Sequence, residues 1–150
     1  MRQHKTLSSP WINNGETVDT EYTLITLEEE YQEGRKWLIG PFLAANSSRY
    51  SQLIEIGYTD LQKVDENDRL HFHSHAEEYY VLLSGQMRIR VGSEEIDVEA
   101  GHILLIRPNV AHVILEVQQG TRILLIKVPP GGTDKTVVDD TGREKGDGDT

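Results

Sequence analysis

From residue 36 onward the chain is built of short segments rich in β-branched and aromatic residues, separated by turn signals. Dipeptides that favour tight turns, Ser84-Gly85, Gly92-Ser93 and Gln119-Gly120, stand between several of them. A repeat of about ten residues is typical of an all-β sandwich or barrel and not of βαβ units. The nine segments lie at 36–40, 51–58, 69–75, 78–85, 86–92, 94–98, 102–108, 111–117 and 121–128.

The two ends of the chain have a different composition. Residues 1–20 are polar and indicate a loop. Thr26 and Glu29 fit a capping box, and Gly34 is a stop signal, so we expect a short helix near 27–33 packed outside the barrel. The expected organisation is an N-terminal arm with this helix (1–35), a barrel (36–130) and a flexible acidic tail (131–150). Residues 129–138 should form at most an ordered arm, and residues 139–150 a disordered acidic end.

Composition argues against several classes of function. A formal net charge of −10 without a basic patch makes nucleic acid an unexpected partner. No apolar run approaches the roughly 18–20 residues that span a bilayer, and the N-terminus lacks the apolar region of a signal peptide. We therefore expect no membrane partner and a cytoplasmic location. The chain has no cysteine, which excludes disulfides, zinc–thiolate sites and thiol nucleophiles.

Several of the expected strands are apolar on both faces. The stretches 113–117 and 123–128 place bulky aliphatic side chains at odd and even positions alike. A strand buried on both sides needs a second layer, which could be the helix and N-terminal arm or another subunit. We expect a homodimer packed through a sheet face.

Three of the six histidines, His71, His73 and His75, occupy alternating positions of one expected strand. Residues i and i+2 of a strand point the same way, so two such imidazoles could bind one metal ion. Glu78 begins the next strand, and His112 lies on a distant one. Three imidazoles and one carboxylate suit a divalent transition metal ion such as Fe, Mn, Ni, Co or Zn. On residue type alone, the histidines could equally be surface groups on a polar strand face.

The spacing around these histidines resembles the first motif of the cupin superfamily, G(x)5HxH(x)3–4E(x)6G. After His71 and His73 the chain continues with four residues, Glu78, six residues and Gly85, and Asp65 stands at the place of the opening glycine. The stretch 101–116 resembles the second motif, G(x)5PxG(x)2H(x)3N. There Gly101 and His112 keep their positions, whereas Arg107, Asn109 and Glu116 replace the family residues and Pro108 is shifted by one.

The resemblance covers roughly residues 50–128 and implies an antiparallel jelly-roll barrel with its site inside. It implies the metal ligands His71, His73, Glu78 and His112. Family spacing selects His71 and His73 and leaves His75 in the loop at the mouth of the site. His75 is then either an exposed loop histidine or a group that contacts substrate or supports a ligand.

Strand alternation assigns the neighbouring side chains. Tyr80 shares the parity of Glu78 and should face the interior, as a core aromatic or as a hydrogen-bond partner of the substrate. Glu77 should point outward. Arg88 and Arg90 would clamp a substrate carboxylate if they faced inward, but we expect them to face water.

The family resemblance implies a range of chemistries: oxygenases, decarboxylases, isomerases, cyclases, lyases and proteins that only bind a ligand. We expect a metal-dependent enzyme that acts on a small oxygen-rich molecule inside the barrel, with Tyr80 and His75 as candidate catalytic residues. A dioxygenase-type oxidoreductase is the first expectation. The alternatives are a metal-dependent sugar or keto-acid isomerase or lyase, and a non-catalytic cupin that binds a small ligand.

Overall fold

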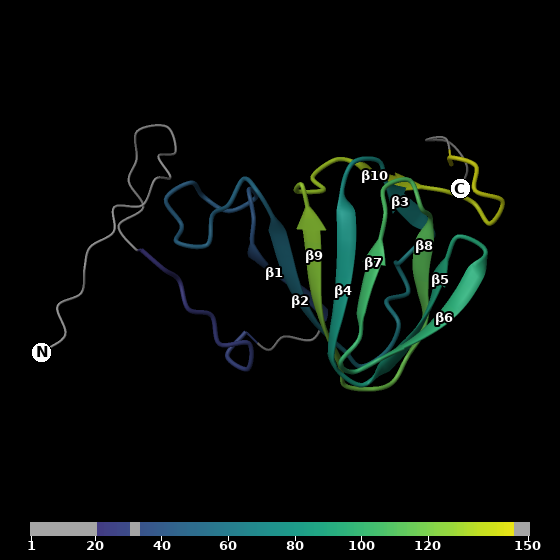
Figure 1. Cartoon of the computed structure of the whole chain (residues 1–150), viewed down its shortest axis with the longest axis horizontal. Helices are drawn as coiled ribbons and strands as arrows, with labels where there is room; N and C mark the ends of the chain where they lie inside the picture. The colour runs from purple at the N-terminus through teal and green to yellow at the C-terminus, as the bar shows by residue number, and fades with distance from the viewer. Residues whose placement is uncertain (1–20, 31–33, 146–150) are drawn as a thin grey trace, which may run out of the picture.

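The computed structural model describes residues 21–30 and 34–145, and its ten strands form two antiparallel five-stranded sheets that face each other (Figure 1). This confirms the expected all-β jelly-roll architecture, and each of the nine expected segments overlaps a strand. The first sheet has the order β1 (Gly34–Ile39), β2 (Glu55–Leu61), β9 (Thr121–Val128), β4 (Glu77–Ser84) and β7 (Ile103–Ile106). The second has the order β10 (Lys135–Val137), β3 (His71–His73), β8 (His112–Val117), β5 (Gln86–Val91) and β6 (Glu94–Glu99).

The inner faces of the sheets are polar toward one end and apolar toward the other. Along β4 the inward side chains run from Glu78 through Tyr80 to Leu82. Successive inward residues of a strand are two positions apart, so this order places Tyr80 between the charged and the aliphatic ends. The apolar end is a buried cluster of Tyr80, Leu82, Met87, Ile89, Val98, Ile106, Ile114, Ile123 and Leu125. Because Met87 and Ile89 belong to it, the alternate residues Arg88 and Arg90 lie on the outer face of β5, as expected.

Two positions of the motifs, Gly85 and Asn109, have a positive φ. Gly85 has φ 76°, and a Cβ there would lie 2.8 Å from the Cα of Thr121. No side chain fits that approach, which accounts for glycine at the end of the first motif. Asn109 stands where the family has glycine and has φ 64°. Asparagine adopts this left-handed conformation more readily than other non-glycine residues, so the replacement preserves the turn.

The N-terminal helix expected near 27–33 is wrong over the residues that the structure describes. Residues 27–30 form a turn, with the Glu29 N–H donating to Thr26 O at 3.1 Å and the Glu30 N–H to Leu27 O at 3.1 Å. Glu30 forms ion pairs with Lys36 and Arg49, which fasten this turn to β1 and to the loop that follows it. The rest of the expected helix, 31–33, and most of the arm, 1–20, lie outside the described residues. No helix in the described parts of the chain is long and apolar enough to cross a membrane.

The barrel continues past residue 130, where the sequence indicated a tail. Strand β10 lies within residues 131–145 and pairs with β3, with Lys135 opposite His73 and Val137 opposite His71. The Val138 N–H then donates to Leu70 O at 2.9 Å. The C-terminal segment is therefore the edge strand beside the histidine strand, and of the expected tail only residues 146–150 fall outside the described chain.

Candidate metal centre

Three histidines and one glutamate converge inside the barrel. His71, His73, Glu78 and His112 each offer one ligand atom, and these atoms all lie within 4.8 Å of one another. All four side chains are buried. This is the set that the sequence spacing singles out, and the structure brings all of it together.

Strand geometry accounts for the convergence. His71 and His73 are alternate residues of β3 and therefore project to the same face. β8 pairs with β3 so that His112 lies directly opposite His71, and their ring centroids are 4.5 Å apart. Glu78, near the start of β4, reaches the same point from the facing sheet.

Two of the histidines are oriented by main-chain carbonyls two residues earlier in the chain. His71 Nδ1 lies 2.6 Å from Arg69 O, and His112 Nδ1 lies 3.0 Å from Val110 O. A carbonyl can only accept, so Nδ1 carries the proton in both rings. The Nε2 atom of each neutral ring is then left with a lone pair.

His73 is oriented by a carboxylate. Its Nδ1 donates to Asp134 Oδ1 at 2.7 Å, and Asp134 Oδ2 accepts the backbone N–H groups of His75 and Ala76 at 3.1 and 3.0 Å. A carboxylate behind a ligating imidazole fixes its tautomer and raises its basicity. Asp134 thus belongs to the site although it lies in the expected tail.

The remaining ring nitrogens fit a cation at the centre of the cluster. His112 Nε2 lies 2.7 Å from Glu78 Oε2. His73 Nε2 lies 3.5 Å from the same oxygen, and it is buried without a hydrogen-bond partner among the described residues. A buried lone pair without a donor is costly, and a metal ion at this point would satisfy it. The donor set of three imidazoles and one carboxylate is suited to a divalent transition metal ion.

Burial sets the protonation states of the cluster. Burial, together with the neighbouring His112, lowers the pKa of His71 to about 3, and burial also lowers the pKa of His73. Burial alone would raise the pKa of Glu78, but the hydrogen bond and charge of His112 outweigh it and lower that pKa to about 2. At neutral pH, His71 and His73 are therefore neutral and Glu78 is ionised, and these are the forms in which the two groups can ligate a metal.

The two candidate catalytic residues occupy different environments. Tyr80 is 3% exposed, faces the interior as expected, and its ring centroid lies 6.1 Å from that of His112. Burial, followed by the charge of Glu78, raises the pKa of Tyr80 well above its usual value of 10. His75 is exposed, and its ring forms a hydrogen bond with Ser74 Oγ at 2.8 Å. Glu77 points away from the cluster and binds Arg107.

Sequence reasoning missed two residues near the cluster, Asp134 and Lys127. Lys127 is 8% exposed, and in the sheet it lies between Glu55 of β2 and Glu78 of β4. Its Nζ is 5.0 Å from the centre of the Trp37 ring. Alternation along β9 could have indicated Lys127, because it shares the parity of the inward Ile123 and Leu125. The sequence contains no comparable signal for Asp134.

Comparisons with known proteins agree with this geometry. The family model described as Cupin domain matches residues 58–123, from within β2 to within β9. Uncharacterized protein SCO3923 of Streptomyces coelicolor is 28% identical over 99 residues, which are 58% of this chain and 86% of that protein.

Two solved structures share the fold. A conserved protein of Klebsiella pneumoniae with a double-stranded β-helix domain superposes with a TM-score of 0.60 at 13% identity, over 80% of this chain and 100% of its own. Pac13, a nucleoside dehydratase from Streptomyces, superposes with a TM-score of 0.50 at 16% identity, over 59% of this chain and 70% of its own. At these identities the likeness shows the fold alone.

Proposed function

This chain belongs to the cupin superfamily, and from that premise we propose that it is a metal-dependent enzyme that acts on a small oxygen-rich molecule inside the barrel. One divalent transition metal ion would be held by His71, His73, Glu78 and His112. Among the reactions open to such a site, we propose a dioxygenase-type oxidation first. Our reason is that complete three-histidine, one-glutamate sets are common among cupin dioxygenases.

The observation that supports the metal most directly is the orphaned Nε2 of His73. All three Nδ1 atoms are committed to acceptors outside the cluster, so three Nε2 atoms and one carboxylate face a common centre. A bound ion would polarise a substrate oxygen or, as iron, activate dioxygen.

Side chains around the ion would orient the substrate and exclude water. Tyr80 keeps its proton at neutral pH because its pKa is raised well above 10, so its hydroxyl would donate a hydrogen bond to a substrate oxygen. The aliphatic cluster beyond Tyr80 excludes water from the closed end of the barrel. His75 lies outside the cluster, and a role for it in moving protons at the mouth stays a prediction.

A metal-dependent isomerase or lyase is the second proposal, with a non-catalytic ligand-binding cupin after it. The dehydratase Pac13 is an enzyme with this fold, and dehydration is a lyase reaction. An isomerase or lyase would use the ion only to polarise an oxygen and would consume no dioxygen.

The first experiment is elemental analysis of protein purified without chelators, followed by oxygen-electrode assays of the Fe(II)-loaded protein. We expect close to one equivalent of transition metal, and oxygen uptake with at least one of a panel of diols, keto acids and phenols. Only trace metal that cannot be restored by loading would refute the metal proposal. Full metal occupancy without oxygen uptake would refute the dioxygenase and favour the isomerase, lyase or binding protein.

We also propose that the chain forms a homodimer through the outer face of the first sheet. Large apolar side chains are exposed there, with Leu83 at 43%, Ile103 at 67% and Val128 at 40%. A second copy covering this face would give these strands the second apolar layer that their composition calls for. A cytoplasmic location and the lack of nucleic-acid and membrane partners stay predictions from composition.

A further inference from the structure

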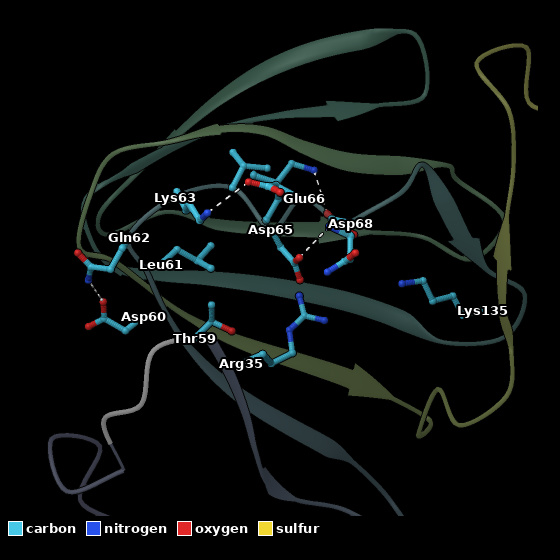
Figure 2. A pocket seen from close by; sticks show the side chains of 13 residues that line it. Arg35, Thr59, Asp60, Leu61, Gln62, Lys63, Asp65, Glu66, Asp68 and Lys135 are labelled. Atoms are coloured by element: carbon cyan, nitrogen blue, oxygen red, sulfur yellow. Dashed lines mark hydrogen bonds and ion pairs between the residues drawn. The ribbon is translucent and has the colours of Figure 1, made fainter. Parts of the chain in front are cut away.

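Outside the histidine cluster the structure contains a pocket of about 510 Å³ (Figure 2). Its walls come from β1, β2, the loop 61–68, β8 and β10. This volume lies within the range of pockets that hold small-molecule ligands.

The pocket adjoins the histidine cluster on the Nδ1 side of His71. Asp68 lines it, and Asp68 Oδ1 is 3.8 Å from His71 Nδ1. Ile114 also lines it, two positions after His112 on the same face of β8. Lys135 lines it from β10, opposite the backbone of His73. A ligand in the pocket would therefore lie beside His71 and beside the strands that carry the histidine ligands.

Two cations in this pocket form no ion pair with any of the described residues. Arg35 and Lys135 form no ion pair or side-chain hydrogen bond within the described chain, and Figure 2 shows their charged ends turned toward the same space. The only side-chain contact recorded for either is the guanidinium of Arg35 over the Trp37 ring, at 5.7 Å. Two unpaired cations turned toward one space are unexpected in a chain with a formal net charge of −10.

The acids of the same pocket, by contrast, all have partners within the chain. Asp60 binds Arg122 and Gln62, and Glu66 binds Lys63. The two remaining carboxylates each accept one backbone N–H: Asp65 Oδ1 that of Asn67 at 2.9 Å, and Asp68 Oδ2 that of Ile114 at 3.5 Å. Carboxylates with acceptor capacity left over can accept hydrogen bonds from ligand hydroxyl groups.

A buried hydroxyl points to a ligand independently of these charges. Thr59 lines the pocket on β2, opposite Arg35 of β1, and it is 2% exposed. Its Oγ1 has no hydrogen-bond partner among the described residues. An unpaired buried hydroxyl costs stability, so its presence in a pocket wall needs an explanation that a bound acceptor would supply.

Lys127 extends the positive region toward the metal centre. After burial, the charges of Arg35 and Lys135 lower the pKa of Lys127, and Lys127 in turn acts on Glu78. The charge of Arg35 lowers the pKa of Tyr80, whereas the charge of Asp68 raises it.

We propose that this pocket binds a hydroxylated organic acid with a single carboxylate. Arg35 and Lys135 hold the carboxylate, Thr59 donates its hydroxyl to the ligand, and Asp65 and Asp68 accept hydrogen bonds from ligand hydroxyls. With a single carboxylate, the remaining polar groups of the ligand are uncharged hydroxyls that can donate to Asp65 and Asp68, whereas a dianionic phosphate would bring a second negative charge near these acids. The inference rests on the proposed function, because it supplies the substrate class for that metal centre.

The test compares gluconate with sorbitol, which has a CH2OH group in place of the carboxylate. Isothermal titration calorimetry is run on the full chain, once loaded with Ni(II) and once metal-free, with glucose 6-phosphate as the phosphate arm. We expect gluconate to bind at millimolar concentration or below, and sorbitol and glucose 6-phosphate to bind more weakly. Equal binding of gluconate and sorbitol, or no binding of gluconate, would overturn the proposal; tighter binding of the phosphate would overturn the carboxylate assignment.

Variants separate this subsite from the metal. Arg35→Gln and Lys135→Gln should each weaken gluconate about tenfold, the size expected for a charge-assisted hydrogen bond, without changing metal content. The matched control Arg88→Gln/Arg143→Gln removes two charges outside the pocket lining and should leave binding unchanged. If the control variant lost gluconate affinity to the same degree, the loss would be an effect of net charge, and the proposed subsite would be overturned.

Thr59→Val gives a readout that a structural role would not. Removing the unpaired hydroxyl should raise the midpoint of thermal unfolding while weakening gluconate several-fold. A lower midpoint with unchanged binding would overturn the role of Thr59. If the chain binds no metal, the metal-free titrations still decide the subsite. If metal binds but the Arg35 and Lys135 variants bind gluconate normally, this inference fails and the metal proposal stands.

Discussion

Asp134→Asn tests whether the C-terminal segment controls the metal centre. In the structure Asp134 Oδ1 accepts the His73 Nδ1–H, and Oδ2 accepts the N–H groups of His75 and Ala76. A carboxamide has only one oxygen. If that oxygen stays with the two backbone amides, the NH2 group faces His73 Nδ1 and donates to it. The proton of His73 then moves to Nε2, the atom that should bind the ion.

The size of the effect follows from the contact. The Asp134 side chain is 10% exposed, so water replaces little of what is lost. A hydrogen bond to a charged group contributes about 1.5–3 kcal/mol, and about 1.4 kcal/mol corresponds to tenfold in affinity. We expect Asp134→Asn to weaken metal binding by about 10–100-fold, the range seen when groups behind metal ligands are changed. Asp134→Ala should weaken it less, because it removes the partner without imposing the wrong tautomer.

The assay is competition for Zn(II) or Ni(II) against a chromophoric chelator, with the tautomer of His73 read from its nitrogen NMR shifts. Asp139→Asn is the matched control, since Asp139 Oδ1 accepts the N–H groups of Thr141 and Arg143 in the same segment. That control should bind metal normally. An Asp134→Asn protein that is folded, binds metal like the parent and keeps Nδ1 protonated would refute the reasoning.

Three further predictions concern the ligand register, the acid stability and the oligomeric state. His73→Ala should lose its metal in elemental analysis, because three remaining ligands rarely hold such an ion tightly, whereas His75→Ala should retain it; the reverse result would mean that the register is wrong. Hydrogen bonds from Arg49 and Lys36 lower the pKa of Glu30 to about 2, so its contribution to stability is full above pH 4.5 and is lost as the pH falls toward 2. Thermal unfolding of Glu30→Gln across that range should show a smaller acid-induced drop than the parent, and an identical drop would contradict the ion pairs. Ile103→Glu should shift the molar mass in light scattering from dimer to monomer, while Leu53→Glu, at a residue 62% exposed, should not; an unchanged mass for Ile103→Glu would argue against the sheet-face dimer.

The histidine register was predictable because it depends on local geometry. Strand alternation puts His71 and His73 on one face whatever the rest of the chain does, and the same rule turns Glu78 inward and Glu77 outward. His112 needed the family motif, since its pairing with His71 is a contact between strands far apart in sequence. Asn109 preserves the turn that precedes His112, because asparagine tolerates a positive φ.

The prediction of an N-terminal helix failed because a capping signal indicates only where a helix would begin. Thr26 and Glu29 supply that signal, yet a helix of about two turns is marginal in water without packing. The ion pairs of Glu30 with Lys36 and Arg49 hold the described part of this segment as a turn on β1 instead. Long-range charge pairing of this kind leaves no periodic trace in the sequence.

The three histidines differ in where the hydrogen-bond acceptor of their Nδ1 atom comes from, and this difference shows what β10 contributes to the site. His71 and His112 find acceptors for Nδ1 in carbonyls two residues earlier, so their own strands orient them. His73 takes its acceptor from Asp134, 61 residues away, and the pairing of β10 with β3 holds that acceptor in place. The edge strand β10 therefore holds the residue before it, Asp134, in the position that fixes the tautomer of His73. The same strand brings Lys135 to the pocket, so a single C-terminal segment links the metal centre to the proposed carboxylate subsite.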